Sequence, residues 1–275
     1  IELTIESVNH RGEGVGRYKG IVVFTPFTVP GEQVVAKITE LKKNHALGRL
    51  IKVTEASALR VEPRCPAFAT CGGSQFQHLD YQLQLELKHR LVTDALKRIG
   101  RIDDALVHPV MGMKDPWGYR NKAQFQIAVR EGQIKLGFFE EGTHQVVTGT
   151  DCVLLDRQIG DVAVMVEGVL NKYGVLAYDW ETGQGLVRHV VIRKSWSTAE
   201  IMVVLVTSRE EFTEQYNIAK EMRAKVPQIA SIVRNINSNR NRQVFGADSL
   251  LLSGQQTITD GIKDLTFKIS PTSFF

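Results

Sequence analysis

The first 56 residues alternate between polar and apolar side chains over short stretches that are separated by glycine or proline turns. Leu3 and Ile5 alternate with polar neighbours, which is the period-two pattern of a half-buried strand. The clearest turn signals are a glycine-dense segment at residues 11–16 and the pair Pro30-Gly31. Four or five short strands in so short a stretch predict a small all-β, OB-like barrel, because closing the sheet leaves no exposed strand edge.

The remainder of the chain has a different hydrophobic pattern, which predicts helices between β-hairpins. A helix is predicted from Asp80 to Ile99, because leucines recur every four residues and Asp80 can act as its cap. Alternating stretches on both sides of residues 130–133 predict a hairpin. Further expected elements are a helix over 157–172, a hairpin that pairs 187–194 with 201–207, and a helix over 210–225. Hairpins interleaved with helices are typical of an α+β domain with antiparallel hairpins, and not of a parallel βαβ sheet.

Length and charge set broad limits on function. A chain of 275 residues fits two or three domains. Its net charge of +4 permits an anionic partner without requiring one. No stretch approaches the roughly 20 apolar residues that span a bilayer, and the first residues lack a signal-peptide layout. We therefore expect a cytoplasmic protein with no membrane partner, and a monomer by default.

Three cysteines are present, at positions 65, 71 and 152. An odd number without a secretion signal argues against a disulfide framework and towards metal or redox chemistry. Cys65 and Cys71 lie in a loop with two prolines and a Gly-Gly pair, where thiolates can converge on one metal centre. The alternative is that the cysteines are inert, buried hydrophobic residues, since three ligands fall short of the usual four.

The segment from Cys65 to Tyr81 resembles the cluster loop of the RNA uracil-5-methyltransferases. In that family the loop reads Cys-x5-Cys-Gly-Gly-Cys before a Gln-His-Leu-x-Tyr-like stretch, and a fourth cysteine follows downstream. The resemblance implies a four-iron, four-sulfur cluster held by Cys65, Cys71 and Cys152. Ser74 stands where the family has its third cysteine, and a serine oxygen is a harder ligand that binds iron less readily than a thiolate.

Other segments resemble the same family. Residues 1–57 are similar to a TRAM domain, an OB-like RNA-binding barrel, in which Lys42 and Lys43 would follow the RNA phosphates. A lysine pair of this kind can also be a plain surface feature. Tyr119-Arg120-Asn121-Lys122 resembles a family segment near the RNA and the active-site cleft, which implies RNA contacts for Arg120, Asn121 and Lys122.

The last residues also match. The stretch 269–275 resembles a family segment in which an aromatic residue contacts the target base, and Phe274 is the candidate here. A basic run fits an RNA-facing edge and comprises Lys220, Arg223, Lys225, Arg234, Arg240 and Arg242.

The resemblance implies S-adenosylmethionine-dependent methyl transfer to carbon 5 of a uridine, in ribosomal RNA and specifically 23S. Such chemistry needs a free cysteine, a base and a glycine-rich cofactor loop, and all three cysteines are already assigned to the cluster. We therefore expect no catalytic residue in this chain, and S-adenosylmethionine as a cofactor of the full-length enzyme only. The expected domains are a barrel at 1–57, an α+β central domain at 58–268, and the start of an absent Rossmann-like methyltransferase domain at 269–275, so that the chain alone would be inactive. The alternatives are a stand-alone, non-catalytic RNA-binding protein and, less favoured by the cysteine spacing, an iron–sulfur redox protein.

Overall fold

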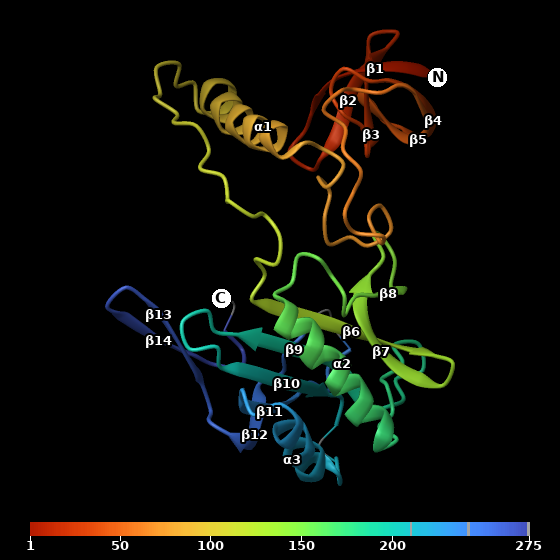
Figure 1. The fold of residues 1–275 in the computed structure, drawn as a ribbon. Coiled ribbons are helices and arrows are strands. Elements are labelled where there is room, and N and C mark those ends of the chain that lie inside the picture. The colour runs from red at the N-terminus through yellow and green to blue at the C-terminus, as the bar shows by residue number, and fades with distance from the viewer. Residues whose placement is uncertain (210, 241–242, 274–275) are drawn as a thin grey trace. The chain divides into compact units, whose positions relative to one another are not determined.

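The computed structural model describes residues 1–209, 211–240 and 243–273, and it divides the chain into two compact units (Figure 1). The first unit is Ile1–Asp115 and the second is Pro116–Phe275.

The first unit begins with the expected small barrel. Its strands are β1 (Glu2–Val8), β2 (Glu13–Tyr18), β3 (Ile21–Pro26), β4 (Gln33–Leu41) and β5 (His45–Glu55). They close in the order β1-β2-β3-β5-β4, with β3 and β5 parallel and the other pairs antiparallel. Inward-facing side chains such as Leu3, Ile5 and Val23 fill the interior. The barrel leaves no room beside Gly14, where a Cβ would lie 1.8 Å from Oγ1 of Thr28.

Helix α1 (Tyr81–Asp94) follows the barrel and continues as a π-helical turn, η1 (Ala95–Ile99). Asp80 caps α1 as predicted, because its carboxylate accepts hydrogen bonds from the backbone N–H groups of Gln82 and Leu83. Leu83 and Leu87 are buried on the apolar side of the helix. They pack with residues of the barrel and of the preceding loop, namely Val8, Val29 and Leu79.

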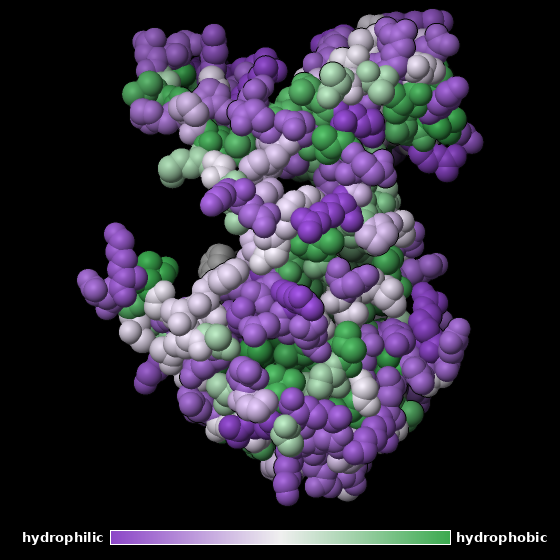
Figure 2. Space-filling model, in the orientation of Figure 1, coloured by the Kyte–Doolittle hydropathy of each residue, from purple (hydrophilic) through white to green (hydrophobic). Residues whose placement is uncertain are grey.

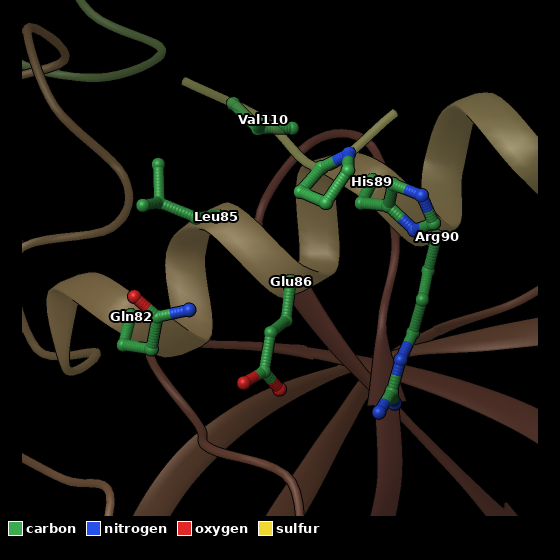
Figure 3. Close-up of a pocket in the computed structure, with 7 residues that line it drawn as sticks. Gln82, Leu85, Glu86, His89, Arg90 and Val110 are labelled. Carbon is green, nitrogen blue, oxygen red and sulfur yellow. The ribbon is translucent and has the colours of Figure 1, made fainter. Parts of the chain in front are cut away.

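Residues 100–115 run back along α1 without forming a helix or strand. The Nε2 atom of His89 lies 3.1 Å from the carbonyl oxygen of Val107, and the backbone N–H of Met113 donates to the Tyr81 hydroxyl at 2.8 Å. An open pocket of about 300 Å³ lies between helix and segment. Figure 3 shows Val110 on one side of the helix and the side chains of Glu86 and Arg90 pointing away from it.

The second unit is built on a seven-stranded sheet in the order β12-β11-β10-β9-β6-β7-β8. The strands are β6 (Lys122–Arg130), β7 (Gln133–Phe139), β8 (Val146–Thr148), β9 (Val187–Lys194), β10 (Ile201–Thr207), β11 (Ile229–Ile236) and β12 (Asp248–Gly254). Helices α2 (Arg157–Lys172) and α3 (Gln215–Lys225) cover one face, where the main core lies (Figure 1). A smaller cluster covers the other face and includes Ile258 from the two-stranded sheet β13 (Ile258–Ile262) and β14 (Leu265–Ile269). Because both faces are covered, every residue of β10 is buried.

The predicted fold class is wrong in its account of this unit. The two expected hairpins exist as β6–β7 and β9–β10, but they belong to one continuous sheet. Strands β10 and β11 are parallel and α3 lies between them in the chain, so the sheet contains a βαβ unit that was not expected from the sequence. Residues 208–228 supply the dozen or more residues that a parallel crossover requires. Alternation identifies each strand but not the direction of its neighbour.

The predicted helix over 157–172 is confirmed by α2. Helix α3 begins at Gln215 and not at residue 210, a position that lies outside the described residues. In the described part of the chain, no helix has the length and apolar character needed to cross a membrane.

Candidate nucleic-acid interface and cysteine loop

Lys42 and Lys43 lie at the turn of the β4–β5 hairpin, and both are exposed. The backbone N–H of Lys42 donates to the carbonyl of His45 at 2.9 Å, which closes the turn. The Lys42 ammonium lies 3.5 Å from a carboxylate oxygen of Glu40, an exposed ion pair of small energetic value. The hairpin therefore presents this pair of cations outward from the barrel.

Three further cations lie on the outer side of the same two strands. Lys37 on β4 is directly opposite Arg49 on β5, and Lys52 is opposite Val35. All of them are exposed. We call Lys37, Lys42, Lys43, Arg49 and Lys52 the basic hairpin face. The visible face of the barrel mixes hydrophobic and hydrophilic side chains (Figure 2).

The sequence analysis missed Lys37, Arg49 and Lys52, although the period-two alternation around Val34 and Ala36 already placed Lys37 on the outer side. Like charges directly opposite on neighbouring strands destabilise a sheet. The Lys37–Arg49 pair therefore costs stability that an anionic partner would restore.

The loop that carries Cys65 and Cys71 is held to the barrel by buried polar groups. The backbone N–H of Cys65 donates to Oε1 of Gln77 at 3.1 Å. His78 is 1% exposed, and its Nε2 lies 3.2 Å from the carbonyl oxygen of Thr28. Burial lowers the pKa of His78, which keeps the imidazole neutral in this apolar setting. The loop is thus an ordered part of the first unit.

The donor atoms of this loop do not match a four-iron cluster. The backbone N–H of Gly73 donates to Sγ of Cys71 at 3.4 Å. Ser74 replaces one thiolate with a harder oxygen. Among the residues that the structure describes, no three His, Cys, Asp or Glu side chains gather into a metal-binding group. An iron–sulfur cluster is therefore unsupported.

Cys152 belongs to the second unit, in the turn before α2, where it packs against the main core and lines a pocket of about 240 Å³. All three cysteines are partly buried and free of disulfides. The joint role of Cys65, Cys71, Ser74 and Cys152 as metal ligands stays a prediction.

The segment Tyr119–Lys122 leads into β6. The backbone N–H of Arg120 donates to the carbonyl of Leu154, and the carbonyl of Asn121 accepts from the N–H of Lys194, both at 2.9 Å. The Arg120 guanidinium lies 5.9 Å from the centre of the Tyr119 ring. The backbone of the segment is therefore fixed on both sides, with Arg120 beside an exposed ring.

Lys122 is turned towards the last described residues. It lies opposite Arg193 on β9, and its ammonium is 3.5 Å from the carbonyl oxygen of Ser273. Nη2 of Arg193 donates to the same carbonyl. Burial, followed by the charge of Arg193, lowers the pKa of Lys122. Two cations thus hold the residue before Phe274, which itself lies outside the described residues.

The expected basic edge is wrong for one of its members. Arg234 is 2% exposed, and its guanidinium donates to Oγ1 of Thr207 at 3.0 Å and to Oε1 of Gln215 at 2.9 Å. It is an interior residue of β11 and cannot face RNA in this fold. Arg242 lies outside the described residues.

The chain is similar to a known domain and to several known proteins. Residues 1–51 match the model of the TRAM domain. An uncharacterized RNA methyltransferase of Bacillus cereus (strain ATCC 14579) is 40% identical over 275 residues, which is 100% of this chain and 60% of the relative. A protein with the same description from Halalkalibacterium halodurans is 39% identical over 275 residues, again 60% of its length. The chain thus spans about 60% of the length of these curated relatives.

A solved structure has a similar fold. The crystal structure of Pyrococcus abyssi tRNA (uracil-54, C5)-methyltransferase in complex with S-adenosyl-L-homocysteine aligns with a TM-score of 0.74 and 23% identity, covering 100% of this chain and 60% of that one. At this identity the likeness concerns the fold.

The expected absence of a methyltransferase domain is contradicted by these matches. The whole chain aligns with methyltransferases, so the expected truncation and the expected inactivity have no support in the alignments.

Proposed function

We propose that the protein is an S-adenosylmethionine-dependent RNA uracil-5-methyltransferase, and that this chain binds the RNA substrate. The observation that carries the proposal is the basic hairpin face on a barrel whose residues match the TRAM domain. The match of the whole chain to about 60% of the length of relatives named as RNA methyltransferases supports the reaction class. Ribosomal RNA is the proposed substrate.

RNA would contact two regions of the chain. In the first unit, the basic hairpin face would follow the phosphates, with Lys42 and Lys43 at its tip. In the second unit, Arg120, Asn121 and Lys122 precede or begin β6, and Lys122 also holds the carbonyl of Ser273. That contact supports a positioning role for Lys122 towards Phe274, the proposed base-stacking residue.

The cofactor S-adenosylmethionine would supply the methyl group to the whole protein. The connection from β10 to α3, residues 208–214, contains no glycine and so lacks the glycine-rich turn typical of such sites. We therefore assign none of the described residues to the cofactor and no residue to the transfer step.

The test is methyl transfer from labelled S-adenosylmethionine to transcripts of 23S ribosomal RNA and of tRNA, with 5-methyluridine identified by mass spectrometry. The proposal expects 5-methyluridine in the ribosomal transcript. Methylation of tRNA alone would overturn the substrate class and keep the reaction. RNA binding without methylation of either transcript would favour a non-catalytic RNA-binding protein.

A further inference from the structure

Arg188, near the start of β9, is a buried cation with one unused edge. The residue is 2% exposed, and its Cζ lies 5.0 Å from the centre of the Tyr178 ring and 4.5 Å from that of Trp180. Nη1 donates to the carbonyls of Asn237 and Asn239. Nε and Nη2 are buried and have no hydrogen-bond partner among the residues that the structure describes. A buried donor without an acceptor costs free energy, so this edge requires an explanation.

The unused edge is the one that arginine uses for bidentate contacts. Arg60, in the loop after the barrel, shows the usual arrangement, with Nε 2.6 Å from Oε1 of Glu32 and Nη2 2.9 Å from Oε2. The planar fork matches the oxygens of a carboxylate or a phosphate. Arg188 presents the same two donors without the two oxygens.

No carboxylate of the described chain fills the fork, since Arg188 is in none of the ion pairs found there. Asp179 is close in sequence, but its carboxylate accepts from the backbone N–H groups of Glu181 at 2.8 Å and Thr182 at 2.9 Å. The adjacent His189 adds a third buried atom, Nδ1, that has no partner in the described part of the chain. No described residue therefore supplies an acceptor for the fork.

A second arginine is held to the same two segments. Nη2 of Arg240 donates to the carbonyl of Thr182 at 3.2 Å, and a Cβ on Gly183 would lie 1.8 Å from that nitrogen. Arg240 is exposed, and it directly follows Asn239, whose carbonyl Arg188 binds. An interior fork and an exposed cation thus share the turn at 178–185 and the segment at 237–240.

We propose that Arg188 and Arg240 bind a phosphate oxyanion, with the Nε–Nη2 edge of Arg188 as the bidentate donor and Arg240 as the cation on the solvent side. Trp180 is 39% exposed and lies against the Arg188 guanidinium. The proposal requires that the turn which carries Trp180 moves aside to admit the anion. The phosphate comes either from an RNA backbone or from free phosphate, and only the first source rests on the proposed function.

The first arm of the test uses inorganic phosphate and the whole chain. At constant ionic strength, phosphate in place of chloride should raise the melting temperature of the wild type, because it binds the folded state. Arg188→Lys keeps the charge but loses the fork, and Arg240→Ala loses the outer cation. Each should need about tenfold more phosphate for the same shift. The matched control is Arg157→Ala on α2, whose side chain is 94% exposed, and it should respond as the wild type.

The proposal is overturned if phosphate produces no shift beyond that of chloride, or if the Arg240→Ala and Arg157→Ala variants respond alike. The second comparison remains decisive even where Arg188→Lys fails to fold, because both of its variants replace exposed residues.

The second arm uses a single-stranded RNA oligonucleotide. If the anion is a backbone phosphate, Arg240→Ala should lower the slope of log affinity against log salt by about one. An unchanged slope together with a retained response to inorganic phosphate overturns the RNA source and supports free phosphate. Failure of the wild type to bind any RNA contradicts the proposed function, and the response to inorganic phosphate then decides alone whether the site binds an oxyanion.

Discussion

At the scale of single residues, the buried pair Glu32–Arg60 fixes the end of the barrel. Glu32 is fully buried, and besides Arg60 it accepts the backbone N–H of Val29 at 2.8 Å. Burial opposes the charge of Glu32, but the hydrogen bonds from Arg60 and Val29 outweigh it and lower the pKa.

We predict that Arg60→Ala lowers the free energy of unfolding of the first unit by about 3–5 kcal/mol, because it leaves a carboxylate buried without its cation. Denaturant titration measures the change. The control is Arg17→Ala, which removes an exposed pair with Glu6 at 3.8 Å and should cost about 0–1 kcal/mol. Equal losses in the two variants would contradict a special role for the buried pair.

A second residue-scale prediction concerns pH. Burial, with a smaller effect from the charge of Arg188, lowers the pKa of His189 from 6.5 to about 4. Between these values the unfolded chain binds a proton that the folded chain does not, so stability falls as the pH drops from 6.5 to about 4 and levels off below. The loss should reach about 3 kcal/mol. His189→Gln should remove this slope, whereas the same change at the exposed His144 should keep it.

Single residues also show which features could be predicted from the sequence and which could not. The cap at Asp80 was predictable, because a cap is decided by neighbours two or three positions away. The burial of Arg188 and Arg234 was not, since arginine is rarely buried and their partners lie 19 to 51 positions away. The sequence shows which side chains are cationic, but not which of them become buried in the fold.

At the scale of elements, the basic hairpin face makes RNA binding testable. We predict that Lys42→Ala with Lys43→Ala lowers affinity for single-stranded RNA and reduces the slope of log affinity against log salt by about 1.4, roughly 0.7 for each phosphate that is no longer neutralised. Filter binding over a salt series measures both the affinity and the slope. Replacing Lys37 should in addition relieve its repulsion with Arg49. The control is Lys263→Ala in the β13–β14 hairpin. An equal fall of the slope in the control would contradict RNA binding by the basic hairpin face.

The cysteine loop gives a second element-scale prediction. The wild-type chain, purified without air, should contain well under four irons per molecule, because Ser74 supplies a poor ligand. Ser74→Cys should raise iron and sulfide content if the loop is organised around a metal. Iron analysis with the visible spectrum measures this, and Ser74→Ala is the matched control. Equal iron in all three proteins would mean that the loop is purely structural.

Elements were predicted better than their arrangement. Helix α2 and the β9–β10 hairpin follow from local periodicity, and their bounds were nearly right. The parallel pairing of β10 with β11 depends on how α3 returns the chain, which no local pattern records. For the same reason Lys37 and Arg49 became neighbours only once the register of β4 and β5 was known.

At the scale of the whole molecule, the chain consists of two units with separate cores. The barrel and the α1 cluster belong to the first unit, and the clusters on the two faces of the large sheet belong to the second. Separate cores imply that a substitution in one unit changes the unfolding of that unit alone. Arg60→Ala and His189→Gln should therefore affect different transitions.

The exposed stretch before Pro116 should be where a protease separates the two units. A hydrogen bond from the N–H of Met113 to the Tyr81 hydroxyl fixes it to α1, and Lys114 follows as an exposed residue outside helices and strands. Arg101 is exposed too, but the N–H of Ile102 donates to the carbonyl of Leu96 at 3.0 Å, which restrains that site. Brief digestion with trypsin should therefore cut first after Lys114 and release two folded fragments, identified by mass spectrometry. Lys114→Gln should slow the cut and Arg101→Gln should not, whereas first cleavage inside the barrel would contradict the division into units.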